Sequence, residues 1–341
     1  MIELPSRVRK IALLGGAACT MFGGLVLWKE TIGGQKLEFV KTKKEIKEET
    51  ENKVFIVTGA NSGIGREVAH ELARKKGKVY MACRDMRKCE EERKNIVLDT
   101  RNKYVYCRKC DLESMESIRE FVNQFKASEE KCDVLVNNAG VMKCRKMLTK
   151  DGIEAQLGVN HFGPYLLTNL LKPYLEVAGT GRVIYLMNLD YRKGKINFSD
   201  LNSSANYDPT TAFNQSQLAN MLTMQEMAKE WEKAKITVNA VYPGVCSTNI
   251  KRHMGVDKSI SGNIVASPIL WLLTRSPERG AQTVLWAATA QEAGTSTGKL
   301  FSNMQETAID IPEDEDIDMV RRKMTAVSKY WTGLQEKEQL K

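Results

Sequence analysis

From residue 53 onward, short segments rich in β-branched residues alternate with longer amphipathic segments. The strand candidates are KVFIVTG, KVYMACR, YVYCRKCDL, CDVLVNNAG, RVIYLMN, ITVNAVYPG and GKLFSN, and helical patterns such as GREVAHELARKK and QSQLANMLTMQEMAKEWEKA lie between them. A strand followed by a helix, repeated, predicts a parallel sheet covered by helices on both faces. We therefore expect an α/β fold with one doubly wound, seven-stranded parallel sheet in a single domain at residues 53–325, followed by a C-terminal tail at 326–341.

The first expected strand runs into a glycine-rich turn, VFIVTGANSGIGREVA, which opens the first helix. Gly59, Gly63 and Gly65 allow a tight turn, a close approach of the backbone to a pyrophosphate, and packing of the helix on the strand. The N–H groups at the start of the helix then meet the phosphate charge. Strand, turn and helix together predict a Rossmann-type dinucleotide site.

Arg84 ends the second expected strand, about twenty residues beyond the glycines, where this fold recognises the ribose. An acidic residue there would accept a hydrogen bond from the 2'-hydroxyl, whereas an arginine accommodates a 2'-phosphate. We therefore expect NADP(H) as the cofactor, with NAD(H) as the alternative. A surface arginine beside Asp85 is the competing interpretation.

The net charge of +9 permits nucleic-acid binding, but charges of both signs alternate in segments such as RKCEEERKN, as on solvated helix faces. We expect no nucleic-acid partner, while contact with an anionic membrane also fits. The eight cysteines lack the spacing of a secreted scaffold and are expected to be reduced thiols. Cys107 and Cys110 form a CxxC, but an extended strand would point them to opposite faces, so we expect no metal site.

An uncharged apolar run, IALLGGAACTMFGGLVLW, occupies residues 11–28 between basic flanks. At about 1.5 Å per residue it reaches roughly 27 Å, close to the thickness of a bilayer core. We expect residues 1–30 to form a retained membrane anchor and residues 31–52 a charged linker. A buried soluble helix and a cleaved signal peptide are the alternatives. Basic residues on both sides leave the orientation in the membrane open.

Five motifs follow one another along the chain: TGANSGIG at 58–65, CDL at 110–112, NNAG at 137–140, GVNHFGPYLLTNLL at 158–171 and YPGVCST at 242–248. In this order they closely resemble the short-chain dehydrogenase/reductases, in particular the retinol dehydrogenases. The resemblance implies a nicotinamide cofactor, a lipophilic small-molecule ligand and a homodimer. The apolar run, ACRDMRKCE and NNAGVMKC resemble a mitochondrial-membrane branch of that group, which implies the mitochondrial inner membrane, with the endoplasmic reticulum as the alternative.

The resemblance also implies roles for individual residues. Asp111 would contact the adenine, Thr248 would hold the nicotinamide carboxamide, and Asn160 would order the water of a proton relay. An N-cap or a core amide is the competing interpretation of Asn160. Pro164 departs from the family pattern and could bend the helix that carries Asn160. The other implied cofactor contacts are Asn61, Ser62, Ile64, Leu112, Asn138, Ala139, Gly140, Pro243 and Gly244.

The family delivers a proton through a tyrosine, with a lysine one helical turn later and a serine at the end of the fifth strand. Aligning AFNQSQLAN with Y-x-x-x-K places Phe213 at the tyrosine and Gln217 at the lysine, and RVIYLMNLD places Asn188 at the serine. Phe213 has no exchangeable proton, and Gln217 has no charge to stabilise a phenolate. We therefore predict a homologue that keeps its cofactor and has lost most of the family's ordinary catalysis.

Two alternatives stay open. Tyr191 and Lys195 have the spacing of a substitute pair, although Gly194 interrupts the helix that the pair would need. With such a substitute, the chain would be an NADP-dependent oxidoreductase of retinoid, steroid or other lipophilic alcohols and carbonyls. The second alternative is a structural membrane protein that binds no nucleotide, and the retained cofactor residues argue against it.

Overall fold

The structure is a computed structural model that describes residues 50–246, 274–311 and 316–334. Its strands are β1 Val54–Thr58, β2 Lys78–Cys83, β3 Val105–Lys109, β4 Val134–Asn137, β5 Arg182–Leu186, β6 Thr237–Tyr242, β7 Leu300–Ser302 and β8 Gln305–Thr307. Its longer helices are α3 Gly63–Arg74, α4 Met86–Thr100, α5 Met115–Lys126, α7 Gly163–Val177, α8 Pro209–Glu230, α10 Pro277–Thr289 and α11 Ile317–Trp331. Short helical segments are α6 Ala155–Leu157, η1 Gly158–Phe162, η2 Leu189–Lys193, η3 Glu232–Ala234 and η5 Glu292–Thr295.

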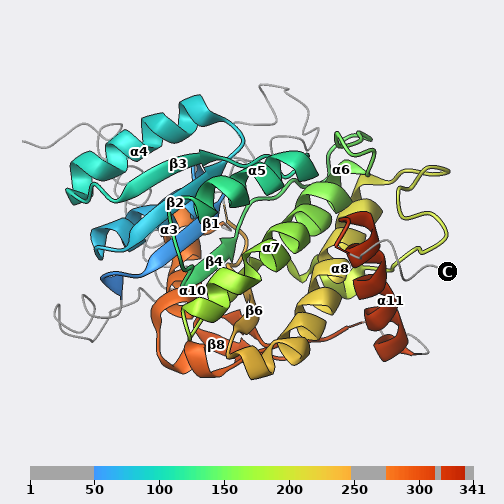
Figure 1. Cartoon of the computed structure of the whole chain (residues 1–341). Coiled ribbons are helices and arrows are strands. Elements are labelled where there is room, and N and C mark those ends of the chain that lie inside the picture. The colour runs from blue at the N-terminus through green and yellow to red at the C-terminus, as the bar shows by residue number, and fades with distance from the viewer. Residues whose placement is uncertain (1–49, 247–273, 312–315, 335–341) are drawn as a thin grey trace, which may run out of the picture.

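All eight strands form one sheet in the order β3-β2-β1-β4-β5-β6-β7-β8 (Figure 1). Helices α3, α4 and α10 supply the apolar side chains that cover one face, and α5, α7, α8 and α11 supply those on the other. Because both faces are covered, the central strands are largely apolar, and every residue of β1 is buried. The expected doubly wound α/β fold is confirmed.

The strand count differs from the expected seven, because β8 adds an antiparallel edge strand to the seven parallel ones. β7 and β8 are joined by Asn303 and Met304, both with positive φ angles, of 50° and 61°. Two consecutive residues of this conformation make the tight hairpin turn whose twist matches that of the strands. The segment Gln305–Thr307 is polar and three residues long, so it carries no strand pattern of its own.

Strand β1 lies between β2 and β4, so the chain reverses its direction of travel across the sheet at this point. Ligands of open α/β sheets bind at such a switch point, outside the carboxyl ends of the strands. The glycine-rich turn between β1 and α3 lies at this edge of the sheet, which places the predicted dinucleotide site there.

The cysteines depart from the expectation of reduced thiols, because Cys89 of α4 and Cys107 of β3 form a disulfide. Both lie on buried faces, and the packing of α4 on β3 brings their Cα atoms to 6.0 Å. Sequence spacing could not show this pair, since the contact depends on where the helix crosses the strand. Cys110 packs on the opposite face of the sheet from Cys107, as the CxxC spacing predicted.

The expected anchor and nearly all of the expected linker lie outside the described residues. Within the described ranges, every helix is too short or too polar to cross a bilayer.

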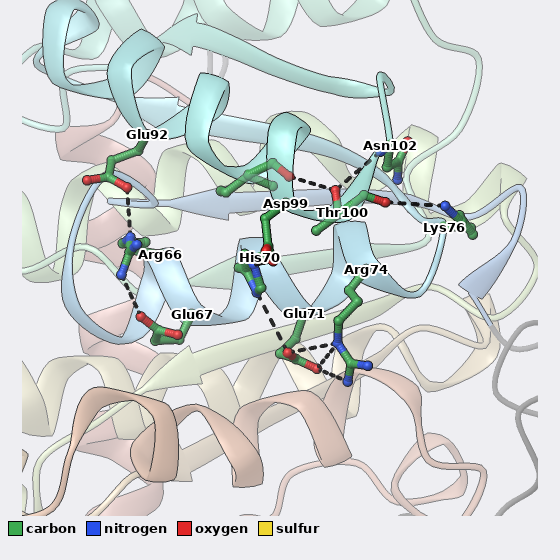
Figure 2. A network of polar contacts seen from close by, with 11 residues as sticks. Arg66, Glu67, His70, Glu71, Arg74, Lys76, Glu92, Asp99, Thr100 and Asn102 are labelled. Atoms are coloured by element: carbon green, nitrogen blue, oxygen red, sulfur yellow. Dashed lines mark hydrogen bonds and ion pairs between the residues drawn. The ribbon is translucent and has the colours of Figure 1, made fainter.

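Helices α3 and α4 are joined by polar contacts on their outer surface (Figure 2). Nε of Arg66 lies 2.7 Å from a carboxylate oxygen of Glu92, and Nε2 of His70 lies 2.7 Å from one of Asp99. Nδ1 of His70 is 3.7 Å from Glu71. The carboxylates of Glu71 and Asp99 raise the pKa of His70 above its ordinary value, against the effect of partial burial.

A pH-dependent contribution to stability follows from His70. Because its pKa is raised in the folded state, the stabilisation is fully present below the ordinary value of about 6.5 and is lost as the pH rises through the raised value. We expect His70→Gln to lower the melting temperature at about pH 5.5 and to leave it nearly unchanged at about pH 9, with a loss of no more than about 1 kcal/mol because both partners are partly exposed. Asp99→Asn should show the same pH pattern, and equal losses at the two pH values would contradict the assignment.

Candidate active site

A cavity of about 420 Å³ opens at the carboxyl ends of the central strands. Most of the site residues expected from the sequence line it: Gly59, Asn61, Ser62, Gly63, Ile64, Arg84, Asp111, Leu112, Asn138, Ala139, Gly140, Asn160, Asn188, Phe213, Gln217, Pro243 and Gly244. Gly65 lies behind the turn, and Thr248 is outside the described residues. Residues that are far apart in the sequence therefore meet at one site.

In the turn between β1 and α3, glycines leave the backbone without side chains where a phosphate would approach. Gly59 and Gly63 have positive φ angles of 65° and 57°, which glycine adopts without a Cβ clash. A Cβ on Gly65 would lie 2.3 Å from Nδ2 of Asn138 and 2.7 Å from the carbonyl oxygen of Gly59. Ser62 occupies the N-cap of α3 but makes no capping hydrogen bond. The first N–H groups of the helix are therefore left for a ligand, which fits a pyrophosphate.

Hydrogen bonds from Asn138 and Ala139 connect the end of β4 to the end of β1. The backbone N–H groups of both residues donate to the Thr58 hydroxyl at 3.0 Å, and Nδ2 of Asn138 donates to the Thr58 carbonyl at 2.8 Å. These bonds hold the loop after β4 against the glycine turn. The loop thus forms the floor of the cavity at the switch point.

Arg84 and Lys88 place two cations at the β2 end of the cavity. The Arg84 guanidinium forms an ion pair with Glu113, and 48% of its side chain is exposed. A bound phosphate would have to share the guanidinium with the Glu113 carboxylate or displace it. Asp111 lies next to this pair, buried, with its carboxylate accepting from the N–H of Glu113 at 3.2 Å.

Asn160 lies in a π-helical turn, η1, directly before α7. Its side-chain amide is held by the backbone of Val141, with Oδ1 accepting at 2.8 Å and Nδ2 donating at 2.9 Å, and Nδ2 also donates to the Ser216 hydroxyl at 3.0 Å. Pro164, in the first turn of α7, has no N–H for the carbonyl of Asn160 four residues earlier. Nδ2 of Asn220 donates to that carbonyl instead, at 2.8 Å.

A buried histidine extends this network to the C-terminal helix. Nδ1 of His161 lies 3.1 Å from Oδ1 of Asn220, and Nε2 lies 2.8 Å from the hydroxyl of Ser328 in α11. Burial lowers the pKa of His161 to about 4, so the ring is neutral at pH 7. Since Oδ1 of Asn220 can only accept, the proton is on Nδ1. The Ser328 hydroxyl lies within hydrogen-bond distance of both Nε2 and the Met324 carbonyl and shares its single proton between these two acceptors.

Helix α8 carries Phe213 and Gln217 on one face, as the sequence predicted. Asp208 caps the helix by accepting from the N–H of Thr211, and Pro209 occupies its first turn, so α8 begins before Phe213. Phe213 and Gln217, four residues apart, are both buried and both line the cavity. Asn188, two residues beyond the end of β5, lines the same cavity.

The two amides present donors to the cavity. Oε1 of Gln217 accepts from the backbone N–H of Asn188 at 2.9 Å, and Oδ1 of Asn188 accepts from the N–H of Asp190 at 3.1 Å. With each oxygen occupied by a backbone donor, the NH₂ groups are left, and neither has a hydrogen-bond partner among the described residues. An amide NH₂ donates a hydrogen bond but does not titrate, so these two positions can bind an oxygen without supplying a proton.

Tyr191 does not act as the substitute tyrosine that the sequence left open. Its side chain is fully buried in the short helix η2, and its hydroxyl accepts from the N–H of Asp310 at 3.2 Å. It is not among the residues that line the cavity. The pair Tyr191 and Lys195 is therefore not a catalytic pair, because η2 ends at Lys193 and no helical face joins them.

The sequence interpretation missed Tyr242, which lines the cavity from the end of β6. It packs on the same face of the sheet as Val238 and Ala240, the face that α7 and α8 cover. The two-residue alternation of β6 could have placed it there. Glu113 and Asn220, which also line the cavity, were missed because no local pattern marks them.

Comparison with known proteins agrees with this geometry. The sequence profile of the family described as short chain dehydrogenase matches residues 53–259. Human retinol dehydrogenase 13 is 41% identical over 317 residues, which cover 93% of each chain. Human retinol dehydrogenase 12 is 40% identical, with 75% of this chain and 79% of that protein covered.

A solved structure supports the same fold. A putative short chain dehydrogenase from Escherichia coli CFT073, complexed with NADPH, superposes with a TM-score of 0.60 at 20% sequence identity, covering 76% of this chain and 99% of that one. The matched profile covers more than half of residues 1–341, and it begins one residue before β1 and includes the glycine turn, Asn188 and α8. The chain therefore belongs to the short-chain dehydrogenase family and has retinol dehydrogenases among its relatives.

Proposed function

We propose that this chain binds a nicotinamide dinucleotide, with NADP(H) preferred, next to a lipophilic carbonyl or alcohol, and that its ordinary catalysis is strongly impaired. The observation that carries the proposal is the combination of the glycine turn at the cavity with Phe213 and Gln217 on the face of α8 that lines the same cavity. Such a protein would act by sensing the nucleotide, by holding a ligand or by presenting a surface to a partner.

The proposed nucleotide binding is supported by the match between residues that line the cavity and the parts of a dinucleotide. The bare glycine turn and the uncapped start of α3 suit a pyrophosphate, and Arg84 and Lys88 suit a 2'-phosphate. The NH₂ group of Gln217 is positioned to donate to a ribose hydroxyl, since its oxygen is occupied by Asn188. When bound, the nicotinamide would supply the hydride.

The proposed impairment of catalysis is argued from the proton transfer that carbonyl reduction requires. A carbonyl that accepts a hydride must also receive a proton on its oxygen, and a positioned acid typically contributes about 10²- to 10⁴-fold to the rate. Asn188, Phe213 and Gln217 offer two amide donors and an aromatic ring, none of which gives up a proton near pH 7. We expect the chain to bind its ligands with little turnover.

The second candidate function is a working oxidoreductase of retinoid, steroid or other lipophilic substrates. The names of its relatives favour it, since both relatives described above are retinol dehydrogenases. Titrating the full-length chain with NADPH and NADH, followed by assays with retinal and simple aldehydes, separates the candidates. Nucleotide binding without turnover supports the first and rapid turnover supports the second. Absence of nucleotide binding would overturn both.

Arg84 is expected to determine nucleotide preference. Losing a charge-assisted contact costs about 1.5–3 kcal/mol, so Arg84→Ala should weaken NADPH binding by about 10- to 100-fold and leave NADH binding nearly unchanged. Arg87→Ala is the matched control, because this exposed arginine of α4 changes the net charge equally and does not line the cavity. An equal loss of NADPH and NADH affinity in Arg84→Ala would refute the 2'-phosphate role.

We further propose that the apolar run at residues 11–28 anchors the chain in a membrane, with the mitochondrial inner membrane favoured over the endoplasmic reticulum. Its length and uncharged composition support the anchor. A lipophilic ligand would then reach the cavity from the bilayer to which the domain is tethered. A homodimer remains a prediction.

A further inference from the structure

Two tyrosines line the cavity, and they differ in what their hydroxyls do. The Tyr185 side chain is fully buried, and its hydroxyl donates to the Thr168 hydroxyl at 3.0 Å. Tyr242 is half-buried at the end of β6, and its hydroxyl has no hydrogen-bond partner among the described residues. Within the described part of the chain, the Tyr242 hydroxyl is therefore unpaired at the cavity wall.

The position of Tyr242 relative to Asn188 follows from the pairing of β5 and β6. Leu186 pairs with Val241, and the N–H of Met187 donates to the Val241 carbonyl at 2.9 Å. In this register Met187 is opposite Tyr242, so Asn188 follows directly after the residue beside Tyr242. Gln217 bonds the N–H of Asn188 from α8, so the three side chains frame one end of the cavity.

The surroundings of Tyr242 keep its hydroxyl protonated. Burial raises the pKa of the phenol, Cys246 and Asp190 raise it further, and Arg275 lowers it. A protonated phenol is both a hydrogen-bond donor and a source of a proton. The other proton-bearing group here, the Cys246 thiol, donates to the Pro243 carbonyl, so the Tyr242 hydroxyl is the proton donor that stays available to a ligand among the described residues.

We propose that Tyr242 donates a hydrogen bond to the carbonyl oxygen of a lipophilic aldehyde or ketone bound in this cavity, and that it is the proton source for whatever slow reduction remains. This inference rests on the proposed nucleotide-binding function. In the reduction, the carbonyl carbon accepts a hydride from the reduced nicotinamide dinucleotide, the carbonyl π-electrons move to oxygen, and the oxygen takes the Tyr242 proton. The phenolate regains a proton from water, which its partial exposure permits.

Tyr242→Phe in the full-length chain tests the proposal with retinal as the probe and NADP⁺ bound, so that no reaction occurs. Losing one hydrogen bond should weaken retinal binding by about tenfold. It should also raise the infrared stretching frequency of the ¹³C-labelled carbonyl, because a hydrogen bond to oxygen weakens the C=O bond. With NADPH in place of NADP⁺, the residual reduction rate should fall by about tenfold or more.

Tyr104→Phe is the control, since Tyr104 is 52% exposed and does not line the cavity. Phenylalanine keeps the packing of the Tyr242 ring, so NADPH affinity in Tyr242→Phe should equal that of the wild type and report an intact fold. Unchanged retinal affinity and an unchanged carbonyl frequency in Tyr242→Phe would overturn the proposed role of Tyr242. Failure of the wild type to bind retinal would overturn it too. Neither result would contradict nucleotide binding. Failure of the wild type to bind NADPH would instead overturn the proposed function itself.

Discussion

A chain carrying Asn188→Ser, Phe213→Tyr and Gln217→Lys together is expected to reduce retinal about 10² to 10⁴ times faster than the wild type. Phe213 already lines the cavity on α8, so a tyrosine there adds a hydroxyl without moving the helix. A lysine at 217, one turn later on the same face, would lower the pKa of that hydroxyl through its charge. The serine at 188 would supply the hydroxyl that the family uses to position the substrate oxygen.

The single variants should fall far short of the triple variant, because groups that act as a unit are strongly non-additive. Phe213→Tyr alone lacks the cation, and Gln217→Lys alone also removes the oxygen that accepts from the N–H of Asn188. We expect that lost hydrogen bond to cost about 1 kcal/mol of stability. Steady-state rates and melting temperatures of the full set of single, double and triple variants provide the measurement. Wild-type turnover equal to that of the triple variant would show that the three replacements do not limit the reaction.

Gly65→Ala is expected to abolish measurable NADPH binding and to destabilise the domain by about 1–3 kcal/mol. The added Cβ would meet Nδ2 of Asn138 at 2.3 Å and the carbonyl oxygen of Gly59 at 2.7 Å. Asn138 cannot retreat without breaking its 2.8 Å bond to Thr58, and the Gly59 oxygen belongs to the backbone of the turn itself. The clash would therefore push the turn out of the shape that receives a pyrophosphate.

Gly179→Ala separates the loss of binding from the loss of stability. Gly179 has a φ of 74° with open space around the added Cβ, so the change costs about 1 kcal/mol through backbone strain alone. It lies after α7, outside the cavity, and NADPH affinity should be unaltered. Isothermal titration and thermal unfolding of both variants give the comparison. NADPH affinity in Gly65→Ala equal to that of the wild type would place the pyrophosphate elsewhere.

The parts of the site that the sequence predicted are those whose geometry is set within a short stretch of chain. The turn from Gly59 to Gly65 needs only a strand, three glycines and a helix, and the spacing of Phe213 and Gln217 needs only one continuous helix. Both features were confirmed because local sequence determines them.

The parts that the sequence did not predict depend on contacts between distant elements. Cys89 meets Cys107 only because α4 packs on β3, and β8 forms only because a two-residue turn folds it back on β7. Tyr191 has the better spacing for catalysis, yet η2 buries it, while Tyr242 reaches the cavity through the pairing of β5 with β6. Apart from the alternation of β6 that indicates the face of Tyr242, no pattern along the chain contains these placements.

The hydrogen bond between His161 and Ser328 bears on how the domain is completed during synthesis. The two residues are 167 positions apart, and they connect the turn that carries Asn160 to the last described helix. A ribosome adds about 5–20 residues per second, so roughly 10 to 30 s separate the emergence of the first partner from that of the second. Through this interval Nε2 of the buried His161 ring lacks its contact with the Ser328 hydroxyl. The nascent domain must therefore hold an unfinished polar cluster beside its cavity until α11 leaves the ribosome and closes it.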